Sequence, residues 1–247
     1  MLALNTTLLD LYWHFFFKKE MQMTLKEKEI LANLFSHIQM PIKISTHQHL
    51  RFQNPQLQKQ QGHFFRITHK NNDEELIQGT TLKLMLVNKM LNTNATTLNI
   101  LNKSEKLQLK YGGTYLNRLD KNKAQKHIQS LLSDALWIRI TDAYIANTNN
   151  NQWEQNQNTI KNILPFRKMD IIITGADKRN QKYKITQSEI KILNNICKNW
   201  TIKSKPIDKN IHDRYIETDK LKILLSSGLY HLSSTSNKDF TYIIEIK

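Results

Sequence analysis

The chain has 247 residues and a hydrophobic fraction of 39%, which is enough apolar material for one large core or two modest ones and excludes a disordered polymer. Lysine and arginine outnumber aspartate and glutamate by 36 to 21, and the resulting net charge of +15 makes polyanions the natural partners. The single cysteine, Cys197, excludes an internal disulfide framework and a cysteine-rich zinc site, and it indicates a reducing, cytoplasmic compartment.

Residues 1–21 contain an apolar patch that Asp10 interrupts. The patch is well short of the ~20 residues that a membrane span needs. The basic residues follow the patch, whereas in a signal peptide they precede it. We therefore expect no transmembrane segment, and we interpret the stretch as a loose arm or as an uncertain leader ahead of a start at Met21 or Met23.

The next region, residues 22–104, mixes helical and strand patterns. Apolar residues recur at helical spacing after Thr24, which forms a capping-box pattern with Glu27. The residues from 63 to 69 predict a strand, and the apolar run from 82 to 91 fits a strand or a helix. The sequence predicts a smaller α+β region here and names no role for it.

Four histidines, His47, His49, His63 and His69, lie within the 23 positions from 47 to 69. No carboxylate stands at a matching spacing, and His-x-His pairs are common in strands. The sequence therefore predicts no metal site.

Residues 105–247 alternate between strand and helix before ending in several strands. Strand patterns occupy 137–145, 169–175, 211–218, 221–226 and 240–246. Helical patterns occupy 116–132, 160–164 and the segment that begins at Thr186, which forms a second capping-box pattern with Glu189. This order is typical of an open α/β sheet with a parallel centre and an antiparallel edge. The segment Gly175–Lys178 lacks the second glycine and the Gly-Lys-Ser/Thr ending of a phosphate-binding loop, so no cofactor is expected.

The most informative segment is the strand-like stretch around Arg214. On a strand alternate residues point the same way, so His212 and Arg214 should share one face while Asp213 faces the other. A guanidinium offers fixed donors to phosphate oxygens, and an imidazole can attack phosphorus or transfer a proton. The sequence therefore predicts a phosphate site, to which the small residues Ser226 and Ser227 would add hydroxyl and backbone donors.

The spacing of these residues resembles the motif of the phospholipase D superfamily. That motif is His-x-Lys, four residues, Asp, six residues and Gly-Ser-x-Asn; the chain has His212-x-Arg214, four residues, Asp219, six residues and Ser226-Ser227-x-Leu229. Arginine, serine and leucine thus stand where the family has lysine, glycine and asparagine. In active members the histidine forms a covalent phosphohistidine while the lysine and asparagine hold the phosphate, so the resemblance implies a degenerate site that leans toward binding without catalysis.

The chain most resembles the phospholipase D-like C-terminal domain of proteins that carry a microtubule-interacting and trafficking domain, and the bacterial relatives of that domain. The similarity runs from Tyr111 to Lys247 and includes Gly228-Leu229 and the segment Thr141–Ile145. It implies a mixed sheet flanked by helices in residues 105–247 and a non-catalytic domain that binds acidic groups, phosphoinositides in the eukaryotic case. The bacterial relatives suggest a role in a defence or mobile-element system.

Two other interpretations of the motif stay open. In the first, Arg214 serves structure: it pairs with Asp142 or Asp219, with Asp213 as a further candidate partner, and His212 caps a strand end. In the second, the site is catalytic, with His212 as nucleophile and Asp219 completing the motif. Active members use two facing copies of the motif, so the second interpretation requires a homodimer.

A second basic group, Lys178, Arg179, Lys182 and Lys184, surrounds Tyr183. The group predicts either a surface that follows a nucleic-acid backbone while the ring stacks on a base, or a solvated loop.

The sequence as a whole predicts a phosphate-binding protein whose partner is nucleic acid. This preference rests on the overall charge and on the lack of a trafficking helix bundle or a membrane anchor. The alternatives are a homodimeric, metal-independent phosphodiesterase or nuclease and a membrane-surface module that binds acidic phospholipid. A basic face docked on an acidic protein, or a codon bias toward lysine and asparagine, would explain the same charge.

Overall fold

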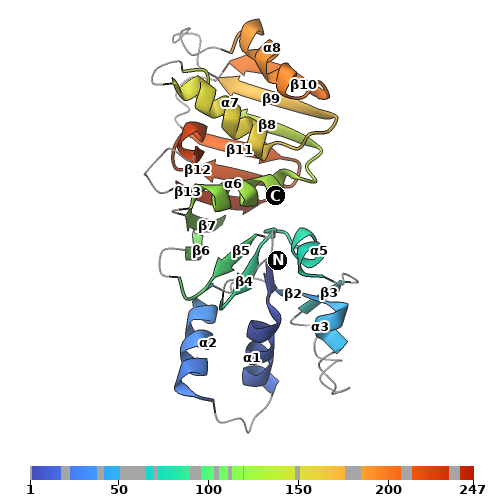
Figure 1. Cartoon of the computed structure of the whole chain (residues 1–247), viewed down its shortest axis with the longest axis vertical. Coiled ribbons are helices and arrows are strands. Elements are labelled where there is room, and N and C mark those ends of the chain that lie inside the picture. Colours follow the sequence, from blue (N-terminus) through green and yellow to red (C-terminus); the bar gives the residue numbers. More distant parts are fainter. Residues whose placement is uncertain are drawn as a thin grey trace. The chain divides into compact units, whose positions relative to one another are not determined.

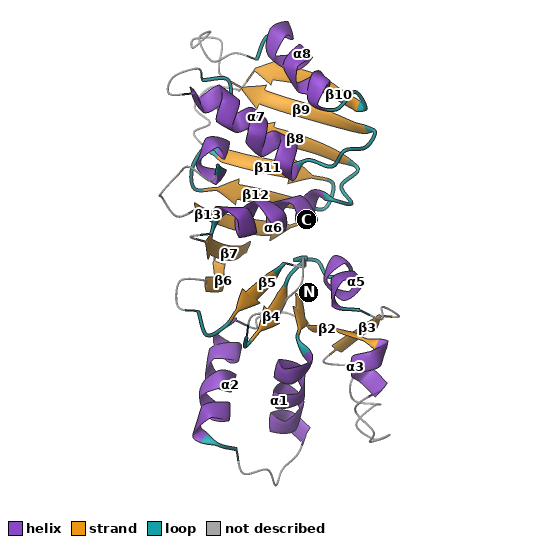
Figure 2. Ribbon diagram, viewed as in Figure 1, coloured by secondary structure: helices purple, strands orange, loops and turns teal. Residues whose placement is uncertain are grey.

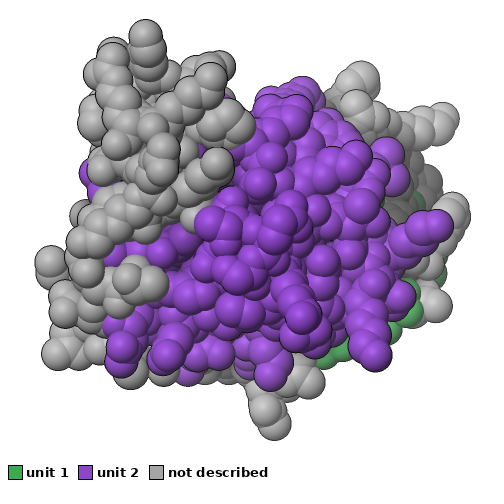
Figure 3. All heavy atoms as spheres, turned by 90° about the horizontal axis from the view of Figure 1, so that it is seen from above, with its two compact units in different colours: residues 1–108 green, residues 109–247 purple. Residues whose placement is uncertain are grey.

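The computed structural model describes residues 2–17, 23–37, 42–50, 65–68, 72–89, 96–102, 106–110, 113–118, 120–147, 151–175, 185–206, 213–233 and 240–247. The chain divides into two compact units, Met1–Gln108 and Leu109–Lys247, which Figure 3 distinguishes by colour. We call them unit 1 and unit 2. Two separate sheets, of five and eight strands, form the framework of the chain.

Unit 1 contains the five-stranded sheet, in which all neighbouring strands run parallel. The strands, in the order β3-β2-β1-β4-β5, are β1 (Leu2–Leu4), β2 (Ile42–Ser45), β3 (Phe65–Thr68), β4 (Met85–Val87) and β5 (Thr97–Asn99). The described helices between them are α1 (Thr6–Phe17), α2 (Leu25–His37), α3 (Thr46–Leu50) and α5 (Asp73–Gln78). Parallel neighbours need crossover connections, so unit 1 is an α/β unit. The predicted α+β arrangement is wrong, because strands of three or four residues carry too little pattern to reveal how they pair.

Residues 2–17 supply a buried strand and a helix with one buried face to unit 1. β1 is the central strand, with β2 on one side and β4 on the other, and its three residues are fully buried. In α1, Leu8 and Leu9 are at most 1% exposed. In place of the loose arm expected from the sequence, this stretch supplies the middle of the sheet and the helix that follows it. None of the described helices is long and apolar enough to span a membrane.

The capping boxes predicted at two helix starts are confirmed. Before α2, the Thr24 N–H donates to Glu27 Oε2 at 2.8 Å, and the Glu27 N–H donates to Thr24 Oγ1 at 3.2 Å. Before α8 (Gln187–Ile196), the Thr186 N–H donates to Glu189 Oε2 at 2.8 Å, and the Thr186 side chain caps the first turn in return. These reciprocal bonds satisfy amide groups that have no partner inside the helix.

Unit 2 is built on the eight-stranded mixed sheet, in the order β10-β9-β8-β11-β12-β13-β7-β6 (Figure 1). The strands are β6 (Lys106–Lys110), β7 (Gly113–Arg118), β8 (Trp137–Thr141), β9 (Met169–Gly175), β10 (Trp200–Pro206), β11 (Arg214–Thr218), β12 (Leu221–Leu225) and β13 (Phe240–Ile246). β8, β9 and β10 run parallel, whereas the neighbours from β8 through β11, β12 and β13 to β7 run antiparallel. The α/β class expected for this region is confirmed, but the parallel strands form one end of the sheet instead of its centre.

Two helices of unit 2, α6 (Lys121–Leu132) and α7 (Gln152–Ile163), lie across one face of this sheet, as Figure 2 shows. The sequence predicted a longer helix from 116. Leu116 instead lies in β7 opposite Tyr242, and Asp120 caps the start of α6 by accepting the Asn122 and Lys123 N–H groups. The early turns of α7 were missed because Asn156, a polar residue, occupies a fully buried position of its inner face.

The core of unit 2 lies between the sheet and these helices. Ile138 and Ile140 of β8, Ile216 of β11 and Ile223 of β12 are all fully buried and alternate with more exposed residues along their strands. This alternation is the pattern of a sheet with one face in the core. The register that it imposes also fixes which side chains meet at the ends of the strands.

Candidate functional site

Asp142 and Arg214 lie side by side at the ends of two neighbouring strands, where β8 ends and β11 begins. β11 runs antiparallel to β8 with Tyr215 opposite Thr141, so the residue before Tyr215 lies beside the residue after Thr141. Arg214 Nε lies 3.5 Å from Asp142 Oδ1. The Asp142 side chain is 2% exposed and the Arg214 side chain 28% exposed, so the pair has a buried carboxylate and a guanidinium that still reaches solvent.

The Asp142 carboxylate is held in place by backbone donors. The Tyr144 N–H donates to Asp142 Oδ1 at 2.9 Å, and the Leu229 N–H also donates to this carboxylate. Burial raises the pKa of Asp142 above its ordinary value of 3.8, although the two N–H donors and the positive charge of Arg214 oppose the increase. Asp142 therefore acts as a fixed anchor for Arg214.

An aromatic ring completes the surroundings of Arg214. The Arg214 guanidinium carbon lies 5.5 Å from the centre of the Tyr144 ring, which is a cation–π distance. The Nε atom is buried and forms no hydrogen bond within the described residues. Asp142 and Tyr144 thus fix the orientation of the guanidinium, and its exposed part can offer paired N–H donors to an anion.

The C-terminal end of β12 lies beside this site, since Leu225 pairs with Arg214. Ser226 is bound to β13 there: its N–H donates to the Thr241 carbonyl at 2.9 Å, and its Oγ accepts the Thr241 N–H at 3.1 Å. A Cβ atom on Gly228 would lie 2.8 Å from the Tyr230 ring and 3.3 Å from Asp142 Oδ2, so this position has no room for a side chain. Ser227 is half-buried and lies between Ser226 and Gly228 in the chain.

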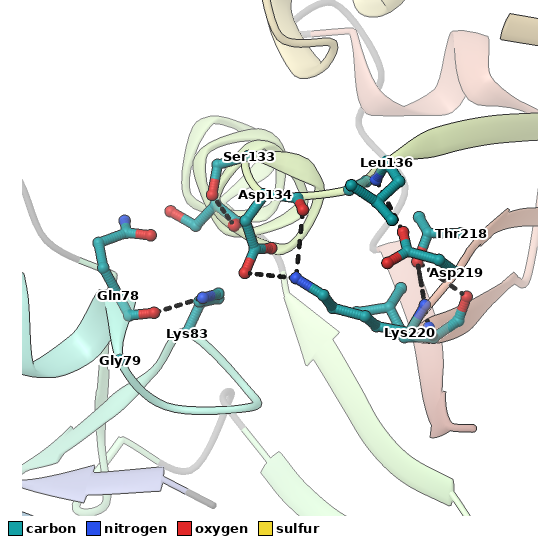
Figure 4. A network of polar contacts seen from close by, with 12 residues as sticks. Gln78, Gly79, Lys83, Ser133, Asp134, Leu136, Thr218, Asp219 and Lys220 are labelled. Carbon is teal, nitrogen blue, oxygen red and sulfur yellow. Dashed lines mark hydrogen bonds and ion pairs between the residues drawn. The ribbon is translucent and has the colours of Figure 1, made fainter. Parts of the chain in front are cut away.

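Asp219 lies at the other end of β11. That strand has five residues and spans roughly 16 Å at the usual rise per residue. In the turn between β11 and β12, Asp219 Oδ1 accepts the Leu136 N–H at 2.8 Å, and the neighbouring Lys220 Nζ lies 3.0 Å from Asp134 Oδ2 (Figure 4). The structure therefore places Asp219 in a turn contact and does not bring it to Arg214.

The other predicted site residues are only partly described. Asp213 is exposed and directly precedes β11. His212 and the basic group Lys178, Arg179, Lys182 and Lys184 lie outside the described residues, so their roles stay predictions. Within the described part of the chain no cluster of histidine, cysteine, aspartate and glutamate could hold a metal ion.

Two features of this site were missed at the sequence level. Tyr144 lies in the segment Thr141–Ile145 but had no predicted role, and the Leu229 N–H that binds Asp142 leaves no signal in a pattern of side chains.

No protein-family model matches the chain, and no curated protein matches it. One solved structure with some similarity is TrmBL2, an archaeal chromatin protein with a novel mode of DNA binding. The alignment has 14% sequence identity and a TM-score of 0.25, and it covers 53% of this chain and 46% of that chain. The chain thus spans less than half the length of that protein, and similarity at this level carries no argument about fold or function.

Proposed function

We propose that this chain binds nucleic acid through unit 2, a phospholipase D-like domain in which the site around Arg214 binds phosphate without hydrolysing it. The observation that carries the proposal is the Arg214 guanidinium, which Asp142 and Tyr144 orient while part of it stays exposed. A guanidinium held in advance loses little conformational entropy when it binds a phosphate.

The surroundings of Leu229 support binding over hydrolysis. Active phospholipase D-like proteins have an asparagine at this position of the motif. The Leu229 side chain is fully buried, and its backbone N–H binds Asp142 instead of a ligand. The site therefore lacks one of the phosphate ligands that the resemblance would require for catalysis, and a hydrolytic role of His212 is the less favoured candidate.

The choice of nucleic acid as ligand rests on charge. The net charge of +15 is spread along the sequence and favours a polymer of phosphates, whose condensed counterions are released on binding. A role in a defence or mobile-element system is a prediction from the resemblance alone.

Replacing Arg214 by alanine should weaken binding to labelled duplex DNA about tenfold, the equivalent of about 1.4 kcal/mol, because one charge-assisted contact to phosphate is lost. The slope of log K against log salt should fall by about one unit. The measurement is a fluorescence-anisotropy titration of the full chain at several salt concentrations.

Arg139→Ala is the matched control for this experiment. Arg139 lies on β8, pairs with Glu217 at 3.1 Å and has a side chain that is 36% exposed. It therefore resembles Arg214 in its charge, its carboxylate partner and its partial exposure, but it lies away from the strand ends. The Arg139→Ala substitution should leave binding unchanged. Equal effects of the two substitutions would contradict a specific role of Arg214.

Cleavage of the DNA that His212→Ala abolishes would favour the phosphodiesterase alternative, and binding to anionic vesicles alone would favour the membrane-surface alternative.

A further inference from the structure

A surface hollow of about 490 Å³ lies on unit 2, lined by residues of α6, of α7 and of the segment that follows α7. Two lysines, Lys126 and Lys161, four side-chain amides and the ring of Phe166 form its lining. No residue of the Arg214 site lines this hollow, and none of the residues described in its lining is acidic. The hollow therefore has a chemical character of its own: cationic, rich in amides and aromatic at one side.

Phe166 presents an aromatic face to solvent. Its side chain is 56% exposed, and its ring centre lies 5.7 Å from that of Trp200. Trp200 is only 4% exposed, and its Nε1–H donates to the Pro165 carbonyl at 2.9 Å, so the tryptophan is a fixed support. The Phe166 ring thus contacts a buried, hydrogen-bonded ring at an angle of 47° and keeps more than half of its surface exposed, so a base can stack on it.

The two lysines can bind phosphate groups next to this ring. Lys126 lies on α6 and Lys161 on α7, and both are exposed. Among the described residues neither ammonium group takes part in an ion pair. No carboxylate among the described residues therefore neutralises their charges. A phosphate chain that crosses the hollow could contact one cation from each helix.

Two of the four amides in the hollow bind each other, and the other two lie along its rim. Asn162 Nδ2 donates to Gln125 Oε1 at 3.0 Å, which ties α7 to α6. Asn122 and Gln129 lie four residues before and three residues after Lys126, on the same side of α6, and both border the hollow. Each carries a donor and an acceptor, which match the hydrogen-bonding edges of unpaired bases.

We infer that this hollow binds single-stranded nucleic acid, with a base stacked on Phe166, phosphates on Lys126 and Lys161, and the rim amides at the base edges. The inference rests on the proposed nucleic-acid binding and adds a contact that selects unpaired bases. In a duplex the faces of the bases are already stacked on one another, so a protein ring can stack only on an unpaired base.

The test compares an oligothymidylate of about 20 nucleotides with a duplex of the same length in anisotropy titrations of the full chain. Phe166→Ala should weaken binding to the single strand about tenfold and leave duplex binding unchanged, whereas Phe166→Tyr keeps a ring and should keep the affinity. The double substitution Lys126→Gln and Lys161→Gln should weaken single-strand binding and reduce its salt slope by about 1.4 units. Lys191→Gln, which removes another exposed lysine, from α8, is the control and should have no specific effect.

The possible outcomes separate this inference from the proposed function. If the single strand binds and Phe166→Ala has no effect, or if that substitution weakens duplex binding equally, the stacking site is wrong while nucleic-acid binding stands. If the unaltered protein binds neither oligonucleotide at low salt, both proposals fail. The far-ultraviolet circular dichroism and the melting temperature of each variant show that a loss of binding is not a loss of fold, which is expected because Phe166 is largely exposed.

Discussion

Replacing Tyr242 by alanine should destabilise unit 2 by about 3–5 kcal/mol, the usual range for removing a fully buried aromatic side chain. Tyr242 is fully buried on β13, between Leu116 of β7 and Leu225 of β12. Its ring centre lies 6.1 Å from that of Phe240, and its hydroxyl lies 2.6 Å from His127 Nδ1 on α6. The substitution thus leaves a cavity where the sheet meets the helix layer. Urea denaturation monitored by tryptophan fluorescence measures the loss, because three of the four tryptophans, Trp137, Trp153 and Trp200, belong to unit 2.

Tyr242→Phe separates the hydrogen bond from the packing. It keeps the ring but removes the hydroxyl that His127 contacts, and His127 is fully buried. A buried polar atom that loses a partner costs about 1–3 kcal/mol, so this variant should lie between the wild type and Tyr242→Ala. Ile243→Ala, on the other face of β13 and only partly buried, is the control and should cost less than about half of the Tyr242→Ala effect. A Tyr242→Ala cost near that of the control would contradict the packing described.

The strands that could be predicted are those with a strong apolar pattern. Met169–Gly175 is a run of mostly apolar residues that pairs on both sides, and Phe240–Ile246 alternates between the core and the open face. β10 was missed, since it lies at the edge of the sheet and pairs only with β9 among the described strands. Its exposed positions carry Thr201, Lys203 and Lys205, which dilute the strand pattern.

Unit 1 was largely unpredictable for a different reason. Its strands β1, β4 and β5 have three residues each, and a pattern with a period of two cannot be recognised over so short a length. The apolar residues of 2–17 were visible, but their division into a strand and a helix depends on Asn5. The Asn5 side chain accepts the Leu8 N–H at 3.1 Å and so starts α1.

The pairing of Arg214 depends on information that no local motif contains. The sequence allowed Arg214 to pair with Asp142 or with Asp219, and it offered Asp213 as a further candidate. Only the antiparallel register of β11 against β8, with Tyr215 opposite Thr141, brings Asp142 to Arg214 and leaves Asp219 at the far end. Registers between distant strands are set by the whole core, which is why the motif alone left both partners open.

The Asp142 anchor gives a second large effect. Asp142→Ala should destabilise unit 2 by about 1–3 kcal/mol, because the Tyr144 and Leu229 N–H groups lose their acceptor in a buried position. Asp142→Asn keeps one side-chain oxygen as an acceptor and should cost less. Arg214 loses its charged partner in both variants, but its side chain is 28% exposed and water can solvate it.

The wild type and Asp142→Asn should also differ in how stability depends on pH. Burial raises the pKa of Asp142 above 3.8, so the folded state holds the carboxyl proton more tightly than the unfolded state does. The contribution of Asp142 to stability is therefore fully present below its unfolded pKa and is lost as the pH rises through the folded pKa. The asparagine amide mimics the protonated carboxyl group at every pH. The free energy of unfolding of Asp142→Asn should therefore rise relative to that of the wild type as the pH increases from about 4 to about 7.

Urea denaturation of the wild type, Asp142→Asn and Asp142→Ala at a series of pH values measures this difference. The free-energy difference between Asp142→Asn and the wild type should change with pH in the stated direction. The difference between the two variants should stay constant, since neither carries an ionisable group at this position. A pH-independent difference between Asp142→Asn and the wild type would mean that Asp142 has the same pKa in the folded and unfolded states. The N–H donors and the positive charge of Arg214 would then offset the effect of burial completely, and the raised pKa described for Asp142 would be wrong.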